Sequence, residues 1–317
     1  MSCHRLPFSL VAALAAAVAV AQQIQPPSAF PPDHMPKGPP SFSAIAYGPH
    51  ARHRLDVHCP AGAGPFPVVV FFHSGAFVAG DKQHGLPNPL LDAVRGAGFA
   101  LASANYRYVS TDPYPAPMQD GARVVQFLRE QAGKFKLDPA RMVVSGISAG
   151  GDIALWVALH DDMADPKSDD PVARQSTRVT AAAVFDVPTS LDHRVVREWL
   201  GGRIENHPSW VQLYGVKTIA ELERPPVRQL AAAASPINLV SRGDPPVWLY
   251  YAAPRIGVPL APDTAVGKFI HHPLFGEKLV GALRAVEVPV TMLTAQDQVE
   301  PGAELAKFLK ATVAAGK

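Results

Sequence analysis

Cysteine is almost absent from this chain, with 2 in 317 residues. They are Cys3 and Cys59, and removal of an N-terminal leader would leave Cys59 alone, so no internal disulfide is predicted. Charged residues make up only 18% and the formal net charge is +2, without a basic run, which argues against a nucleic-acid partner. Stability must therefore come from an apolar core, and 48% hydrophobic residues can supply one.

The chain also has no hydrophobic run long enough to span a membrane. The longest, "FSLVAALAAAVAVA" over 8–21, falls below the roughly 18 residues that a spanning helix needs. Arg5 precedes this run, and Ala19 and Ala21 form an A-x-A cleavage site before Gln22. These features predict a signal peptide over 1–21 and a secreted or periplasmic protein.

Proline, in contrast, is abundant, with 33 residues, about twice the usual share of ~5%. Several prolines lie in "QQIQPPSAFPPDHMPKGPPS", residues 22–41. Such a composition favours extended backbone, so this segment is predicted to be a tether.

From residue 42 onward, predicted strands and helices alternate. A hairpin opens the domain, and apolar runs such as "FPVVVFF" and "VWLYY" read as buried strands between amphipathic helices such as "MQDGARVVQFLRE". This pattern predicts an α/β domain over 42–317 with a mostly parallel, doubly wound sheet. Residues 189–235 interrupt the alternation, and we expect them to form a small helical cap over the carboxyl edge of the sheet.

One stretch predicts a nucleophile. In "MVVSGISAGGDIALW", residues 142–156, Gly146, Ser148 and Gly150 form a G-x-S-x-G motif between a β-branched run and a helix-forming run. A nucleophile elbow has this strand–turn–helix setting, in which the serine occupies a sharp turn at a helix N-terminus. The glycines are expected because a side chain at either position would collide with a neighbouring element.

A second loop predicts an oxyanion hole. "FFHSGAF", residues 71–77, ends another buried strand, and in serine hydrolases with such an elbow this loop supplies backbone N–H groups. The candidate donors are Gly75, Ala76 and Ala149, the residue after the serine. His73 is expected to fix the loop by hydrogen bonding rather than to act as a base.

With these motifs the chain resembles the α/β-hydrolase superfamily, close to hormone-sensitive-lipase-like and BD-FAE-like esterases. "HSGAF" stands where those esterases have HGGGF or HGGGW, "ANYRY" matches their strand-four signature, and "LDPARMVVSGISAGG" matches their elbow. The resemblance covers roughly residues 43–310. It implies the α/β-hydrolase fold and the hydrolysis of an ester through an acyl-enzyme on Ser148.

The resemblance fails at the other two catalytic positions. The family carries an acid just after the strand matched by "PPVWLYY" and a histidine in the loop after "VPVTML". Here the first segment reads "AAPRIGVPLAPD", and the second loop, "TAQDQVEPG", contains no histidine. Without a base a serine hydroxyl is a poor nucleophile.

Two interpretations follow. In the first, "DTAVGKFIHHP" supplies a rewired triad: His272 or, slightly less favoured, His271 as the base, and Asp263 as the acid, with Asp186 at the end of "AAAVFD" as a second acid candidate. In the second, the chain is a catalytically impaired protein that binds a small molecule, a glycan or a partner protein.

We favour the first interpretation, a secreted serine carboxylesterase. Its substrate would be a small-molecule or polysaccharide-borne ester. The chemistry requires no metal and no organic cofactor, and none is predicted.

Overall fold

The computed structural model describes residues 39–83, 88–202, 207 and 209–315, so the predicted leader and nearly all of the tether lie outside the described residues. Its centre is an eight-stranded sheet of order β1-β2-β4-β3-β5-β6-β7-β8. The strands are β1 (Phe42–Ala46), β2 (Arg54–His58), β3 (Phe66–Phe72), β4 (Ala100–Ala104), β5 (Leu137–Ile147), β6 (Ala181–Phe185), β7 (Val247–Tyr251) and β8 (Val290–Thr294).

The direction of the strands divides the sheet into two parts. β1 pairs with β2, and β2 with β4, in antiparallel register, which gives the predicted opening hairpin. β4, β3, β5, β6, β7 and β8 are all parallel. Because parallel strands share one carboxyl edge, the loops that follow β3, β5 and β6 meet there.

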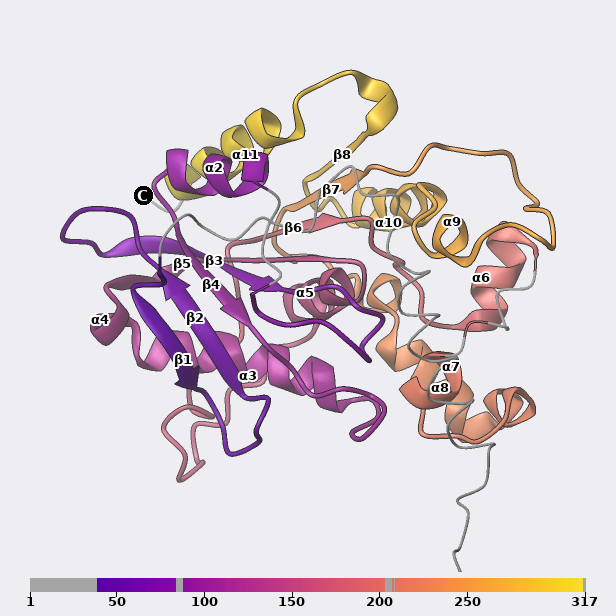
Figure 1. The fold of residues 1–317 in the computed structure, drawn as a ribbon, viewed down its shortest axis with the longest axis horizontal. Helices are drawn as coiled ribbons and strands as arrows, with labels where there is room; N and C mark the ends of the chain where they lie inside the picture. Colours follow the sequence, from indigo (N-terminus) through magenta and orange to yellow (C-terminus); the bar gives the residue numbers. More distant parts are fainter. Residues whose placement is uncertain (1–38, 84–87, 203–206, 208, 316–317) are drawn as a thin grey trace, which may run out of the picture.

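Helices cover both faces of the sheet (Figure 1). One face carries α2 (Asn88–Gly96) and α11 (Pro301–Ala315), which contact each other. The other face carries α3 (Ala116–Glu130), α4 (Ala132–Phe135), α5 (Ala149–Leu159) and α10 (Leu274–Ala285).

The apolar run of β3 explains why both faces must be covered. Val69 and Phe71 pack in a cluster with Leu305 of α11, whereas the alternate residues Val70 and Phe72 pack in the cluster that contains α3 and α5. Successive side chains of a strand point to opposite faces, so a continuous apolar run needs a helix layer on each side. The predicted α/β architecture with a mostly parallel sheet is confirmed.

A long excursion separates β6 from β7. It contains α6 (His193–Leu200), α7 (Ser209–Leu213), η2 (Ile219–Glu223), α8 (Pro225–Ala234) and η3 (Pro236–Leu239). In Figure 1 these helices lie together beside the sheet, next to α9 (Val266–Ile270). The short η4 (Ala295–Asp297) follows β8.

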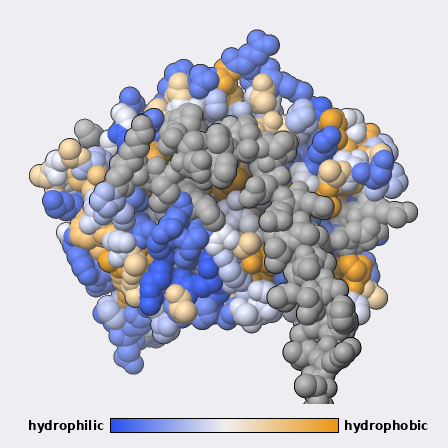
Figure 2. Space-filling view, in the orientation of Figure 1, coloured by the Kyte–Doolittle hydropathy of each residue, from blue (hydrophilic) through white to orange (hydrophobic). Residues whose placement is uncertain are grey.

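None of the helices in the described ranges is both long and apolar enough to cross a bilayer. On the face shown in Figure 2, hydrophobic side chains are interspersed with hydrophilic ones, the usual state of a globular surface.

Candidate active site

The elbow predicted at Ser148 has the expected geometry. Ser148 lies between β5 and α5 with φ 52° and ψ −122°, a conformation rare for a residue with a side chain. A Cβ atom added to Gly146 would lie 2.2 Å from the carbonyl oxygen of Gly150, and one added to Gly150 would lie 2.0 Å from that of Phe72. The steric reason given for the two glycines is therefore confirmed.

The structure places a histidine against the serine. The Nε2 atom of His271 lies 2.9 Å from the Oγ atom of Ser148. His271 follows α9 directly, and its N–H group donates to the carbonyl of Gly267, which fixes the backbone at this point. Ser148 and His271 are both buried. This distance lies within the ~2.6–3.2 Å that proton transfer to a general base requires.

The surroundings keep His271 neutral. Burial, and to a smaller extent the nearby His207, lower the pKa of His271 from 6.5 to about 4. When Ser148 donates its hydroxyl proton to Nε2, the hydrogen of the neutral ring resides on Nδ1. Nδ1 has no hydrogen-bond partner among the residues that the structure describes.

His272, the histidine slightly preferred from sequence, faces elsewhere. Its Nε2 atom lies 2.9 Å from the carbonyl oxygen of Ile256, and its Nδ1 atom accepts from the N–H group of Leu274 at 3.1 Å. Both ring nitrogens thus serve the loop before α10, and the structure brings His271, not His272, to Ser148.

Neither candidate acid contacts His271. Asp186 is buried at the end of β6, where its Oδ1 atom accepts from the N–H group of Ala252 at 2.8 Å. Burial raises the pKa of Asp186 to about 6, while the hydrogen bonds from the backbone at Ala252 and Ala253 lower it. Asp263 is exposed in a turn before α9. Of the sequence-predicted base and acids, only His271 reaches the serine.

The candidate oxyanion loop is held rigidly. The Tyr106 hydroxyl donates to the carbonyl of His73 at 2.8 Å, and the His73 ring contacts the carbonyl of Ser74 and the guanidinium of Arg52. His73 thus has the predicted hydrogen-bonding role in this loop. Gly75 turns the chain with φ 122°, where a Cβ atom would strike the carbonyl of Ala79 at 2.2 Å.

Two of the three predicted oxyanion donors line one cavity, and Gly75 is not among its lining residues. Ala76 and Ala149 line the same pocket as Ser148. Within the described part of the chain, neither of their N–H groups donates to another protein atom. Two free amides beside a serine hydroxyl are an arrangement that can bind a developing negative charge.

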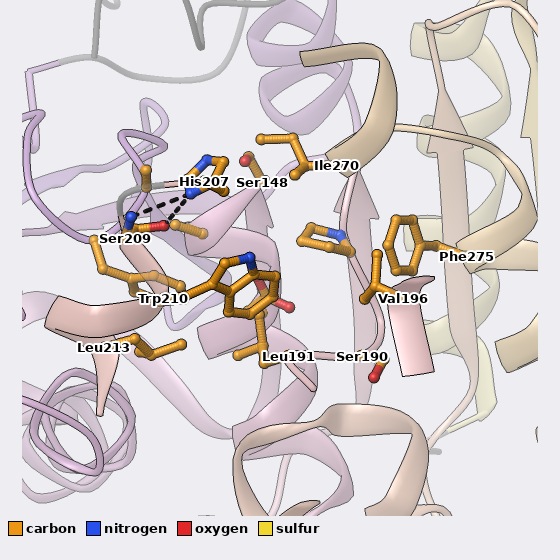
Figure 3. A pocket seen from close by; sticks show the side chains of 15 residues that line it. Ser148, Ser190, Leu191, Val196, His207, Ser209, Trp210, Leu213, Ile270 and Phe275 are labelled. Atoms are coloured by element: carbon orange, nitrogen blue, oxygen red, sulfur yellow. Dashed lines mark hydrogen bonds between the residues drawn. The ribbon is translucent and has the colours of Figure 1, made fainter. Parts of the chain in front are cut away.

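The pocket beside Ser148 is small, with a cavity volume of about 40 Å³. The 189–235 segment supplies much of its wall, and Ile270 and Phe275 close another side (Figure 3). The cap-side residues are Ser190, Leu191, Val196, His207, Ser209, Trp210 and Leu213. The pocket is therefore mostly apolar and suited to a short acyl chain.

Two titratable residues of this pocket, His207 and Asp152, were not identified from the sequence. His207 is buried, and its Nδ1 atom accepts from the N–H group of Ser209 at 3.2 Å (Figure 3). Its Nε2 atom has no partner in the described ranges, and burial lowers its pKa to about 4. Asp152 is fully buried one turn after Ser148. Its position four residues after the serine on a predicted helix was the only signal available.

No group of three or more metal-ligating side chains occurs within the described ranges. The site therefore consists of a serine, a histidine, two free amides and a largely apolar pocket. This set can carry out acyl transfer by nucleophilic catalysis.

A known protein family matches this chain, and the relatives of the chain include proteins named as esterases or carboxylic ester hydrolases. A family model described as BD-FAE matches residues 55–260. Esterase LipI of Mycobacterium tuberculosis is 34% identical over 117 residues, which is 34% of this chain and 33% of LipI. A protein of the same organism named "Probable carboxylic ester hydrolase LipM" is 26% identical over 218 residues, 65% of this chain and 46% of LipM. The match spans about one third of LipI and less than half of LipM.

Solved structures share the fold. A truncated carbohydrate esterase from gut microbiota superposes with a TM-score of 0.68 at 16% identity, covering 88% of this chain and 100% of that one. An acetyl ester-xyloside bifunctional hydrolase from Caldicellulosiruptor lactoaceticus superposes with a TM-score of 0.66 at 21% identity, covering 89% and 99%. These likenesses confirm the α/β-hydrolase fold.

Proposed function

This chain belongs to the BD-FAE family, and we propose that it is a serine hydrolase of carboxylic esters. One observation carries the proposal: the 2.9 Å contact between the Ser148 Oγ and His271 Nε2 atoms. It supplies the base that the loop after β8 lacks. The named relatives, an esterase and a carboxylic ester hydrolase, support the same class of reaction.

In the first half of the reaction, the Ser148 oxygen attacks the ester carbonyl carbon and its proton passes to His271 Nε2. The carbonyl π bond breaks, and the resulting oxyanion accepts hydrogen bonds from the N–H groups of Ala76 and Ala149. Gly75 shapes the loop that presents Ala76, and its own N–H is a third candidate donor. The carbon–oxygen bond to the alcohol then breaks, and the alkoxide leaves with the proton from His271.

In the second half, water attacks the acyl-enzyme carbonyl and gives a proton to His271. The bond to Ser148 breaks, and the serine oxygen recovers that proton as the carboxylic acid leaves. The original serine proton leaves with the alcohol and a proton from water replaces it, so the enzyme is regenerated and the cycle consumes only ester and water. No metal or organic cofactor takes part in the proposed steps.

We further propose that Ser148 and His271 act as a pair. In a complete triad a carboxylate stabilises the imidazolium that forms during catalysis. Within the described residues no carboxylate is hydrogen-bonded to His271 Nδ1, and Asp186 bonds to a backbone amide instead. We therefore expect a turnover slower than that of an enzyme with a full triad.

The apolar pocket favours a short acyl group, and the alcohol would extend toward solvent. A small ester and an acyl group carried on a polysaccharide both satisfy this arrangement. The two solved neighbours are a carbohydrate esterase and an acetyl ester-xyloside bifunctional hydrolase, which supports including polysaccharide-borne acetyl esters among the substrates to be tested.

The proposal is tested by hydrolysis of p-nitrophenyl acetate and butyrate by the mature protein and its Ser148→Ala variant. Turnover that the substitution removes supports the serine mechanism. Equal background rates for both proteins would support the alternative, a protein that binds a ligand without cleaving it.

We also propose that the protein is exported. The proposal rests on the leader pattern over 1–21, which lies outside the described residues. Mass spectrometry of the protein secreted by its host should find an N-terminus at Gln22. An intact N-terminus on cytosolic protein would contradict export.

A further inference from the structure

Asp152 lies in the pocket one helical turn beyond the serine. Its N–H group donates to the Ser148 carbonyl at 3.0 Å, and residues four apart on a helix share a face. Asp152 has no exposed surface and lines the same pocket as Ser148. The proposed reaction assigns it no role.

The Asp152 carboxyl group has no partner among the described residues: neither oxygen accepts or donates a hydrogen bond. Its charge would act on three buried tyrosines, but each of their hydroxyls donates elsewhere. The acceptors are the backbone carbonyls of His73 for Tyr106, Leu191 for Tyr214 and Val187 for Tyr251.

Burial raises the pKa of Asp152 well above its usual value, which favours the neutral carboxylic acid. In that form it offers one O–H donor and a carbonyl acceptor. Buried polar groups in folded proteins are nearly always hydrogen-bonded. A polar group without a partner inside a ligand pocket therefore suggests that the ligand supplies the partner.

We propose that Asp152 determines specificity by binding a hydroxyl group on the buried acyl chain of the ester, which makes short hydroxyacyl esters the preferred substrates. A hydroxyl matches a neutral carboxyl group because each can donate one hydrogen bond and accept another. Four residues rise about 6 Å along a helix, a separation for which we choose a hydroxyl two or three bonds from the carbonyl carbon held at Ser148. This inference rests on the proposed esterase function.

The apolar walls of the pocket also favour a hydroxyacyl chain over a plain acyl chain. Leu191, Val196, Trp210 and Phe275 give it apolar walls, so a plain acyl chain would fill the space but leave the Asp152 carboxyl group unbonded. Sites built to bond a substrate hydroxyl discriminate strongly against the analogue that lacks it, because the protein group then remains unpaired.

The test compares kcat/KM for the p-nitrophenyl esters of butyrate and of each enantiomer of 3-hydroxybutyrate. The parent protein should prefer one hydroxy ester by on the order of tenfold or more. Asp152→Asn keeps a neutral donor and acceptor and should keep part of that preference. Asp152→Leu, nearly the same shape without polar atoms, should reverse it in favour of butyrate.

The outcomes separate this inference from the function it rests on. If Ser148-dependent cleavage of butyrate is observed but the parent has no hydroxyl preference, the inference is overturned and the esterase stands. A preference that both Asp152 variants retain also overturns it, since the hydroxyl is then bound elsewhere. If no ester is cleaved, the proposed function and the inference fail together.

Discussion

The Nε2 atom of His271 lies 2.9 Å from the Oγ atom of Ser148, although the two residues are 123 positions apart in the chain. The loop after β8, where related hydrolases carry their histidine, lies next to β7, the strand that precedes His271. His271 thus follows the strand next to β8 in the sheet, and we propose that it supplies the base. A catalytic pair is defined by geometry and not by chain position.

The adjacent histidines allow a matched test of the base. His271→Ala removes the proton acceptor of Ser148, and we expect kcat on p-nitrophenyl butyrate to fall by about 10³-fold or more. His272→Ala removes only the bonds to Ile256 and Leu274 and should retain most of kcat. Steady-state kinetics of the two variants show which histidine acts as the base. A larger loss for His272→Ala would restore the histidine first preferred from sequence.

The pH dependence of activity should extend to unusually acidic values. His271 can accept the serine proton only while neutral, and its pKa lies at about 4 rather than 6.5. Activity should thus be lost as the pH falls through about 4, measured as kcat/KM against pH. His207→Asn should move this limb upward, because His207 lowers the pKa of His271. A midpoint near the ordinary histidine value of about 6.5 would contradict a buried, neutral base.

The acid candidates are separated by two isosteric substitutions. Asp186→Asn should change kcat by less than about tenfold, because the side chain can still accept from the Ala252 N–H group and does not orient His271. Asp263→Asn, in an exposed turn, serves as the control. Kinetics on p-nitrophenyl butyrate provide the measurement. A loss approaching the ~10⁴-fold of a triad acid would identify Asp186 as the third member of the site.

His207 should lower the free energy of unfolding at acidic pH. Its pKa is about 4 in the folded protein and about 6.5 when unfolded, so between these values only the unfolded chain binds the proton. The free energy of unfolding therefore falls as the pH is lowered through this window, by about 3 kcal/mol for this group. His207→Asn removes the contribution while its side-chain oxygen can still accept from Ser209.

Urea unfolding at about pH 7 and pH 4.5 measures this effect. The loss of stability between the two pH values should be smaller in His207→Asn than in the parent. Asp186 acts in the opposite direction, since its raised pKa favours the folded state at low pH, but it is present in both proteins and cancels. Equal losses would show that His207 titrates normally in the fold.

The sequence alone predicted the parallel sheet and the elbow at Ser148, because burial and steric contacts dictate both. Apolar runs such as 66–72 must be buried on both faces. Gly146 follows from a close contact within the elbow, and Gly150 from its close approach to the carbonyl of Phe72 at the end of β3. The choice between His271 and His272 was different. Adjacent residues in a helical turn point about 100° apart, so only the orientation of the chain after α9 decides which one faces the serine.

Asp152 and His207 illustrate a second limit. "AGGDIALW" reads as an apolar helix with one polar residue, and whether that residue faces a pocket depends on which segment covers the helix N-terminus. That cover comes from residues about 40 to 60 positions later, including Leu191 and Trp210. Local patterns contain no information about such a distant contact.

Asp152 should reduce the stability of the folded protein, because its buried carboxyl group has no hydrogen-bond partner among the described residues. A buried carboxyl group without a hydrogen-bond partner costs about 1–3 kcal/mol, and Asp152→Leu replaces it by an apolar group of similar shape. We expect Asp152→Leu to raise the free energy of unfolding by an amount in this range. Asp152→Asn, which keeps the unpaired polar atoms, should gain much less.

The gain in the free energy of unfolding of Asp152→Leu should depend on pH. With its pKa raised, Asp152 remains protonated in the folded protein above pH values at which the unfolded chain has lost the proton. Parent stability from this group therefore falls as pH rises above about 4, and the advantage of Asp152→Leu should be larger near pH 8 than near pH 5. Urea unfolding of both proteins at the two values measures it. A variant less stable than the parent at both would mean that the carboxyl group is already satisfied in solution, by an ordered water or a resident ligand, and that the pocket does not leave it for a substrate hydroxyl.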